Sequence, residues 1–337
     1  MGRRDYATYS KSWSPPAYSV DDDGKVVGGY RPAGRNNWGR WGEDDRRGTA
    51  NLIGPEQVLE AAALVRKGDV YSLTLPIDAT APRWPDRQPH NHYFLMTGSD
   101  SITGNPYNEL AEGFIFNDDS IDMSLQGSTQ WDGLGHVEVK DTLYNGFWAG
   151  NITATGGDSV LGIGRQSESF VGRGVLIDLA RAAGTESLEP GTVVTPEMLD
   201  AACEAQGLTV RDGDVVLLRT GFQSRWWSLT GDDEKREYWS SWPGPGLAGA
   251  EWLLEHGAAA AASDTVGFEV MPGEGGEIYP VHQLLLVDCG FTIGEMWELE
   301  KLATACAEDG SYEFLLVAPP LNFPRAVGSP LNPIAIK

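Results

Sequence analysis

Hydrophobic and polar positions along the chain repeat with two different periods, and the change of period divides the chain into helices and strands. Segments whose apolar residues recur every three or four positions predict helices, and most of them also begin at Pro or Thr or end at Gly. These segments are 55–68, 195–207, 250–257, 282–290 and 299–307. Short apolar or alternating runs predict strands. These runs are 69–76, 93–96, 174–180, 214–220, 258–265, 291–295 and 312–318.

Helices and strands alternate after residue 170, whereas the first half holds mostly strands and loops, and no segment repeats. We therefore predict a single α/β domain over residues 36–337, with a mixed β-sheet and peripheral helices. Residues 1–35 are rich in Ser, Pro, Gly and Asp, which predicts a tail or an arm. Residues 77–115 are expected to be mostly loop, and residues 224–246 form a Trp-rich insertion.

The 337-residue chain carries 48 acidic residues against 25 basic ones, a formal net charge of −23. Such a charge repels phosphate, which argues against a nucleic acid or an anionic membrane surface as a partner. No apolar stretch approaches membrane-spanning length, and no signal peptide is expected. The three cysteines are odd in number and lack metal-type spacing. A reducing compartment, the cytoplasm, is therefore expected.

One segment, residues 125–137, places polar side chains between small residues and apolar flanks. Gln126, Gln130, Asp132 and His136 follow one another at spacings of four, two and four. Such groups are suited to binding a metal or a substrate, and histidine titrates near neutral pH. The chain has no G-x-S-x-G elbow, no G-x-G-x-x-G after a predicted strand and no G-x-x-x-x-G-K-[ST]. We interpret this segment as the active-site segment.

Two further groups of residues are candidates for the same site. His282 begins a predicted helix, and Glu295 ends the strand that follows, thirteen residues on. A helix, a turn and a strand can bring these two ends together, which makes them a candidate pair of metal ligands. His90 and His92 flank one residue of a Pro-rich loop, so both point to one side, where they could form a pocket rim.

Residues 126–136 resemble the signature of the cyclase family, which includes bacterial kynurenine formamidase, isatin hydrolase and a trans-dienelactone hydrolase. The family pattern is H-x-G-T-H-x-D-x-P-x-H. Thr129, Asp132 and His136 match it, whereas Gln126 and Gln130 stand where two metal-binding histidines are usual. The resemblance covers roughly residues 40–337, because further family landmarks follow in order. They lie at 172–178, 213–221, 263–264, 280–282, 294–295 and 319–321.

The resemblance implies a barrel-like sheet and a metal-dependent reaction. In this family, zinc or manganese activates a water that attacks an amide, lactone or formyl carbonyl. The ligands of one such metal would here be Asp132, His282 and Glu295, and His136 would shuttle the proton. Because a glutamine is a weaker zinc ligand than a histidine, we expect a single divalent metal ion, Mn or Zn. Gln130 and Gln126 would add oxygen or water contacts.

The expected function is hydrolysis of an amide or lactone bond in a small, cyclic or aromatic substrate. Trp131, Thr129, His92 and Tyr93 are expected to contact that substrate. The tryptophans of residues 224–246 either wall the pocket or pack at a subunit interface. The resemblance also suggests a homodimer or homotetramer. The alternative is a protein that kept the fold but lost the metal, and that binds a small molecule.

Overall fold

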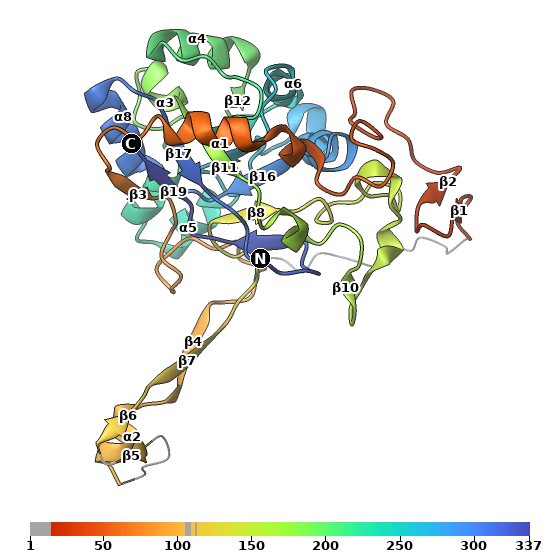
Figure 1. Ribbon diagram of the computed structural model, residues 1–337. Coiled ribbons are helices and arrows are strands. Elements are labelled where there is room, and N and C mark those ends of the chain that lie inside the picture. Colours follow the sequence, from red (N-terminus) through yellow and green to blue (C-terminus); the bar gives the residue numbers. More distant parts are fainter. Residues whose placement is uncertain (1–14, 105–108, 112) are drawn as a thin grey trace.

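A nine-stranded mixed sheet runs through the computed structural model, which describes residues 15–104, 109–111 and 113–337 (Figure 1). Its strand order is β18-β8-β16-β15-β13-β11-β17-β19-β3. The bounds in this order are Gly328–Pro330, Gln130–Asp132, Thr292–Glu295, Ala260–Ser263, Val215–Arg219, Val171–Asp178, Glu313–Val317, Ile334–Ile336 and Val70–Ser72. The four central strands are parallel, and the outer strands join antiparallel on both sides. The predicted α/β domain with a mixed sheet is confirmed.

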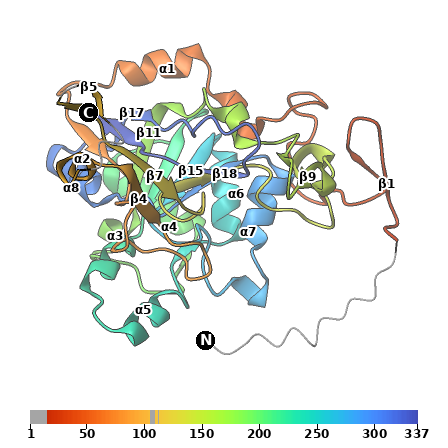
Figure 2. The same cartoon turned by 90° about the horizontal axis from the view of Figure 1, so that it is seen from below.

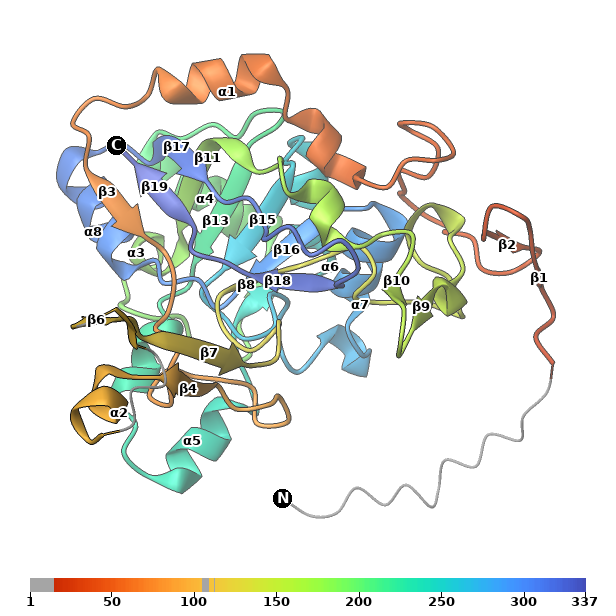
Figure 3. The ribbon, with the colours of Figure 1, turned by 60° about the horizontal axis from the view of Figure 1, so that its bottom comes forward.

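Most helices of the described residues lie around this sheet, whereas α2 lies apart from it (Figure 3). The α-helices are α1 (Pro55–Ala62), α2 (Gly98–Ile102), α3 (Leu179–Ala182), α4 (Pro196–Gln206), α5 (Asp232–Tyr238), α6 (Leu247–Glu255), α7 (Pro280–His282) and α8 (Glu300–Asp309), and α7 continues into the π-helix η8 (Gln283–Asp288). Short 3₁₀ turns are η2 (Gly48–Leu52), η3 (Tyr144–Gly146), η4 (Ala149–Asn151), η5 (Ile163–Gln166), η6 (Gln223–Ser228) and η7 (Glu274–Gly276). None of the helices in the described part of the chain has the length and low polarity needed to cross a bilayer.

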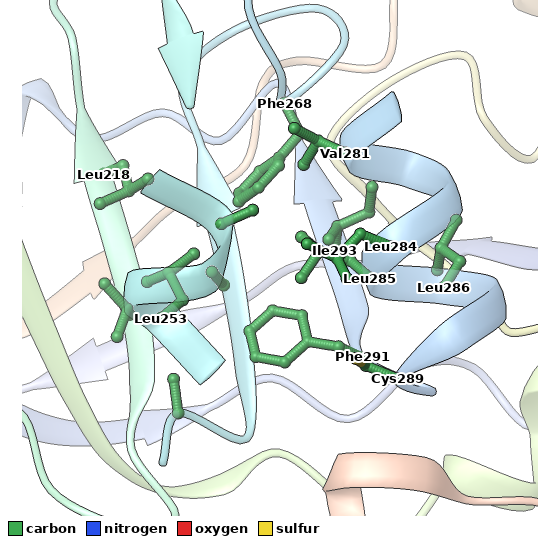
Figure 4. Close-up of a cluster of buried hydrophobic side chains, with 14 of the residues drawn as sticks. Leu218, Leu253, Phe268, Val281, Leu284, Leu285, Leu286, Cys289, Phe291 and Ile293 are labelled. Atoms are coloured by element: carbon green, nitrogen blue, oxygen red, sulfur yellow. The ribbon is translucent and has the colours of Figure 1, made fainter. Parts of the chain in front are cut away.

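The central strands are buried on both faces, because successive side chains enter two different apolar layers. On β13, Val216 and Leu218 join one layer, and Val215 and Leu217 join the other. The first layer also contains apolar side chains of α4, α6, α7 and η8, and the second those of α8. Figure 4 shows part of the first layer, in which side chains of α6 and η8 face the sheet.

Several predicted elements are shorter than expected, and hydrogen bonds explain the difference. The helix expected at 55–68 ends at Ala62, because Leu64 and Val65 bond to carbonyls three residues back. The strand expected at 69–76 ends early, because the Leu75 N–H donates to the Thr129 hydroxyl instead of a neighbouring strand. The helix expected at 282–290 is mostly π-helical, and the Cys289 N–H reaches the carbonyl five residues back. Wide turns of this kind often occur at functional sites.

The described residues between 91 and 122 form an arm that projects away from the sheet (Figure 1), and in the view from below β4 and β7 lie in front of the body (Figure 2). Its two long strands, β4 (Asn91–Met96) and β7 (Asp118–Asp122), pair antiparallel. The tip holds α2 with the short strands β5 (Glu109–Ala111) and β6 (Phe114–Ile115). The strand predicted at 93–96 is confirmed as part of β4. The expectation of loop over the other residues of 77–115 is wrong where α2, β5 and β6 form. The pairing was missed because β7 reads as a polar segment on its own, and only its partner shows it to be a strand.

The predicted N-terminal tail falls partly outside the described residues, which begin at residue 15. Residues 15–35 contain the hairpin of β1 (Ser19–Val20) and β2 (Val26–Val27) and then run over the body. The Tyr30 hydroxyl donates to Asp288 (2.7 Å), and Arg35 pairs with Glu255 (3.0 Å). Other paired short strands are β9 (Ile152–Thr153) with β10 (Gly157–Asp158), and β12 (Val193–Val194) with β14 (Gly244–Pro245). The three cysteines are buried and free, and the cytoplasmic location stays a prediction.

The fold predicts a stability difference between two glycines of the sheet. A Cβ at Gly294 on β16 would lie 2.6–2.8 Å from Ala262, Trp297 and Trp131, whereas one at Gly172 on β11 would meet only Ile53 at 3.5 Å. Gly294→Ala should therefore lower the free energy of unfolding by about 1–3 kcal/mol through overpacking. The control Gly172→Ala should leave it unchanged or raise it slightly. Chemical denaturation of both variants checks this, and equal stability would contradict the close packing at Gly294.

Candidate active site

The pairing of β8 with β16 places three polar side chains on one face of the sheet. Gln130 lies directly opposite Glu295, and Asp132 follows two residues along the same strand. Because side chains of a strand alternate between faces, all three project to the same side. Each is buried, with Asp132 and Gln130 only 1% exposed. This face is also the one covered by α6 and α7, so a residue of those helices can reach the group.

His282, at the end of α7, completes the group. Its Nε2 atom lies 3.5 Å from Oε1 of Glu295. Ligand atoms of Asp132, His282 and Glu295 all lie within 4.8 Å of one another, and all three residues are buried. Two carboxylates and one imidazole form a donor set that suits a divalent cation such as Zn²⁺ or Mn²⁺. The structure thus brings together the three residues expected as ligands.

Glu269, which the sequence analysis missed, holds His282 from behind. Its carboxylate accepts the backbone N–H groups of Val281 (3.2 Å) and His282 (2.9 Å), and it also contacts Nδ1 of His282. With Nδ1 donating to this carboxylate, Nε2 is left facing Glu295. A carboxylate in this position fixes the orientation and the tautomer of a metal-binding histidine. The one signal in the sequence was an acidic residue between Phe268 and Val270, which is an unusual place for a charge.

Burial shapes the protonation of this group. Burial, together with the nearby Asp132 carboxylate, raises the pKa of Glu295 to about 7. Burial alone would lower the pKa of His282, but its hydrogen bonds to Glu269 and Glu295 outweigh burial and raise the pKa to about 10. Without a metal, a proton on His282 therefore offsets part of the buried negative charge. A divalent cation would replace that proton, because a ligating histidine is neutral.

The two glutamines of the motif behave differently. The Nε2 group of Gln130 donates to Glu295 (2.8 Å) and lies 3.4 Å from Asp132, while its Oε1 atom has no partner among the described residues. Gln126 lies at the wall of the cavity, and its Nε2 group is also without a partner there. A half-turn of the Gln130 amide would exchange its nitrogen and oxygen and present an oxygen to a cation. The residues present therefore fit a single divalent cation.

His136 faces a cavity of about 380 Å³ beside this group. Its Nε2 atom lies 3.8 Å from Oδ1 of Asp132, and burial lowers its pKa below the ordinary value. A neutral imidazole at this place can accept a proton. Gly135 is required beside it, because a Cβ there would lie 2.1 Å from the Asp158 carboxylate. The cavity is lined by Trp84, Asp86, Arg87, Gln126, His136, Val137, Trp242, Val266, Gly267, Tyr279, His282, Glu295 and Met296.

Backbone strain gathers around the same residues. Phe268, Tyr279 and Met296 have positive φ angles of 46°, 54° and 56°, a conformation that is costly for bulky side chains. Phe268 precedes Glu269, Tyr279 precedes α7, and Met296 follows Glu295. Strained residues of this kind tend to cluster at functional sites.

The residues expected to contact substrate lie elsewhere. Trp131 and Thr129 are fully buried: the indole packs on Phe170 and Trp297, and the hydroxyl donates to the Met296 carbonyl (2.6 Å). His92 and Tyr93 lie on the arm, which does not line the cavity of the same chain, and His92 contacts Asp119 (2.7 Å) there. The structure does not bring these four residues to the cavity.

Only one tryptophan of the 224–246 insertion, Trp242, lines the cavity, and its ring meets Trp84 edge to face at 5.9 Å. Trp226 and Trp239 pack together beside it, and Trp227 is about half exposed. The insertion therefore supplies one residue of the cavity wall and a supporting aromatic cluster. Trp84, which the sequence analysis left out, supplies another.

Comparison with known proteins identifies the family. The Cyclase family model, described as "Putative cyclase", matches residues 71–270. A crystal structure described as that of a novel cyclase is 42% identical to this chain, and it superposes with a TM-score of 0.85 over 90% of this chain and 99% of that chain. The chain therefore belongs to the cyclase family, as the motif at residues 126–136 predicted.

More distant structures share the fold. Isatin hydrolase A from Labrenzia aggregata is 20% identical, with a TM-score of 0.55 over 83% of this chain and 97% of that one. A predicted metal-dependent hydrolase from Bacillus stearothermophilus is 16% identical, with a TM-score of 0.50 over 80% of this chain and 98% of that one. At these identities the likeness concerns the fold alone. The comparison with curated proteins gives no match.

Glu269→Gln should weaken the binding of a divalent cation by about 10- to 100-fold, because an amide orients His282 less firmly than a carboxylate. Isothermal titration with MnCl₂ and ZnCl₂ measures this without relying on activity. Glu277→Gln, an exposed position in the same part of the chain, is the matched control and should bind like the unchanged protein. Equal affinities for the Glu269 and Glu277 variants would rule out an orienting role.

Proposed function

We propose that this protein is a metal-dependent hydrolase that opens an amide or lactone bond of a small, flat, cyclic or aromatic substrate. The observation that carries the proposal is the buried group of Asp132, His282 and Glu295 beside a cavity that His136 also faces. Three protein ligands that leave a side of the cation open are typical of catalytic rather than structural metal sites. Membership of the cyclase family agrees with this proposal.

A divalent cation held by these residues would supply Lewis acidity to a carbonyl group and would lower the pKa of a water molecule. The chain's own residues do the remaining work. Asp132 and Glu295 would hold the cation from two strands, and Glu269 would keep His282 oriented for binding through Nε2. Manganese is favoured over zinc, because two carboxylates and an amide oxygen outnumber the single imidazole.

His136 is proposed to move the proton. Burial keeps its imidazole neutral near neutral pH, so Nε2 can take a proton from water and return it to the leaving nitrogen or oxygen. The nearby Asp132 oxygen, 3.8 Å away, stabilises the charged ring that forms in between. The proton therefore goes from the attacking water to His136 and then to the leaving group.

The cavity favours a flat substrate. Trp84, Trp242 and Tyr279 contribute aromatic walls, and the volume of about 380 Å³ is in the range of small-molecule sites. Tyr279 also packs edge to face on the His282 ring at 5.0 Å. A ring-shaped substrate would stack against these walls with its carbonyl directed at the group of Asp132, His282 and Glu295.

One observation favours the alternative, a metal-free protein that binds a small molecule. The Gln130 amide already donates to the carboxylate that a metal would bind, so the group is partly satisfied without a cation. Histidines at positions 126 and 130 would bind a metal more tightly than the two glutamines do. The experiment below separates the two functions.

The test combines metal analysis with a hydrolysis screen. Protein purified without chelator and offered Mn²⁺, Zn²⁺ or Fe²⁺ should retain near-stoichiometric metal, and Asp132→Ala and His282→Ala should lose it. The metal-loaded protein should hydrolyse at least one of N-formylkynurenine, isatin, a dienelactone and simple lactones. His136→Asn should keep the metal but lower kcat by about 10²- to 10⁴-fold, the usual contribution of a general acid–base group.

Failure to retain any of the three metals would end the metal-dependent proposal. Retention of metal without hydrolysis of any compound would favour the binding function. A His136→Asn variant with unchanged kcat would remove His136 from the mechanism while leaving the metal site intact.

We also propose that the protein is a homo-oligomer in which the arm packs against a second copy. A two-stranded ribbon is marginally stable on its own, and this one exposes Tyr93, Phe94, Leu95 and Ile121. Residues 88–139 contain no Lys or Arg, which disfavours an acidic partner such as nucleic acid. In a two-fold symmetric contact, the apolar side chains of the arm would be buried on both copies.

Light scattering coupled to gel filtration should give the mass of two or four chains. Phe94→Ser with Leu95→Ser should shift the protein toward the monomer, because an arm contact would lose apolar burial. Leu59→Ser, at an exposed apolar position of α1 away from the arm, is the control and should leave the mass unchanged. A monomeric unchanged protein would contradict the proposal.

A further inference from the structure

We infer that Arg87 anchors an anionic group of the substrate, so that the substrate class is a flat molecule carrying a carboxylate in addition to the scissile bond. This inference rests on the proposed function and adds the chemical class of the substrate to it. Arg87 is the only Lys or Arg among the described residues that line the cavity. No motif in the sequence pointed to it.

The position of Arg87 is set by a turn that also supplies an aromatic wall. Its backbone N–H donates to the Trp84 carbonyl (2.9 Å), and its own carbonyl accepts from Arg83. This turn directs Trp84 and Arg87 toward the same cavity. The aromatic wall and the cation are therefore presented together, as a molecule with a ring and an attached anion requires.

Arg87 is partly buried, and within the described ranges the structure shows no hydrogen bond or ion pair to its guanidinium. An arginine has five N–H donors in a planar fork, which a carboxylate can satisfy with two parallel hydrogen bonds. The two arginines that are fully buried are paired with carboxylates in this way. Arg173 pairs with Asp214 and Glu313, and Arg219 pairs with Asp178 and Glu300. Arg87 differs because its donors open into the cavity.

Arg87 lines the same cavity as His136 and Glu295. The Asp132 and Glu295 carboxylates are already engaged by Gln130 and His282. A cation bound to them would leave still less attraction for the guanidinium. Asp86 also lines the cavity, but the described residues show no ion pair between it and Arg87. The guanidinium is therefore available to an anion that enters the cavity.

The net charge of the chain also bears on which substrates Arg87 suits. A chain with a net charge of −23 repels anions from a distance. A neutral or cationic substrate would need no arginine in the cavity, and an arginine there would repel a cationic one. An anionic substrate needs local positive charge to overcome the repulsion, and Arg87 supplies it at the side of the cavity next to the reacting groups.

Equilibrium binding of two probes tests the inference independently of turnover. Benzoate and benzamide have nearly the same shape, but only benzoate is anionic. Both are titrated into the Mn²⁺-loaded protein and into the metal-free protein, with tryptophan fluorescence or calorimetry as the readout. The proteins are the unchanged chain, Arg87→Gln, Arg87→Lys and, as a control that removes one exposed positive charge elsewhere, Arg236→Gln.

The ratio of the benzamide Kd to the benzoate Kd is the decisive quantity. Arg87→Gln should lower this ratio by about tenfold or more in both metal states, the usual effect of losing a charge-assisted bidentate pair. Arg87→Lys should give an intermediate ratio, and Arg236→Gln should not change it. An unchanged ratio in Arg87→Gln would overturn the inference. So would a benzoate preference that depends on the metal alone.

The outcome is separable from that of the proposed function. A benzoate preference that requires Arg87, in a protein that hydrolyses nothing, would leave the anion site standing and remove the hydrolase. The opposite outcome is also distinguishable. If Arg87→Gln hydrolyses neutral substrates with an unchanged KM and shows an unchanged Kd ratio, the hydrolase stands and the anion site is removed.

Discussion

The register between β8 and β16 is the constraint on which the candidate site depends. It sets Gln130 opposite Glu295 and places Asp132 on the same face. Because side chains of a strand alternate, a slip of one residue would turn both polar groups of β8 to the other face and bring Trp131 into the site. Short strands have little pairing energy of their own, and β8 has only three residues. Something other than the ladder must hold it in place.

Side chains around β8 supply that restraint. The Trp131 indole is wedged against Phe170 and Trp297, and its N–H donates to the Ala318 carbonyl (2.7 Å). The Trp297 indole donates to the Gln130 carbonyl (3.2 Å), and the Thr129 hydroxyl donates to Met296. Gly294 leaves the space that the Trp131 ring fills. Trp131 and Thr129, which were expected to contact substrate, thus stabilise the strand register that positions Asp132.

The sequence was sufficient to predict the parts of the molecule that follow from local pattern. Helix α4 is where its Thr cap and its closing Gly207 predict it, and Asp132, His282 and Glu295 meet as the motif implies. Three features escaped prediction, two of them because they depend on partners that are distant in the sequence. The arm needs the polar strand β7 to pair with β4, the contact of Glu269 with His282 spans a loop, and Arg87 has no motif. His92 and Tyr93 were placed at the pocket because a Pro-rich loop, and not a projecting ribbon, was expected there.

The strained residues bear on how the site is assembled. A bulky residue with positive φ costs about 1–3 kcal/mol, and it persists only where the surrounding structure holds it. Phe268 and Met296 are both buried in packed surroundings, so folding of the body offsets the cost at these positions. Each of these two residues adjoins a residue of the site, since Phe268 precedes Glu269 and Met296 follows Glu295. The energy that brings Glu269 and Glu295 to His282 therefore comes from the folded core. A group that the folded core holds in this way does not have to be ordered when a cation or substrate binds.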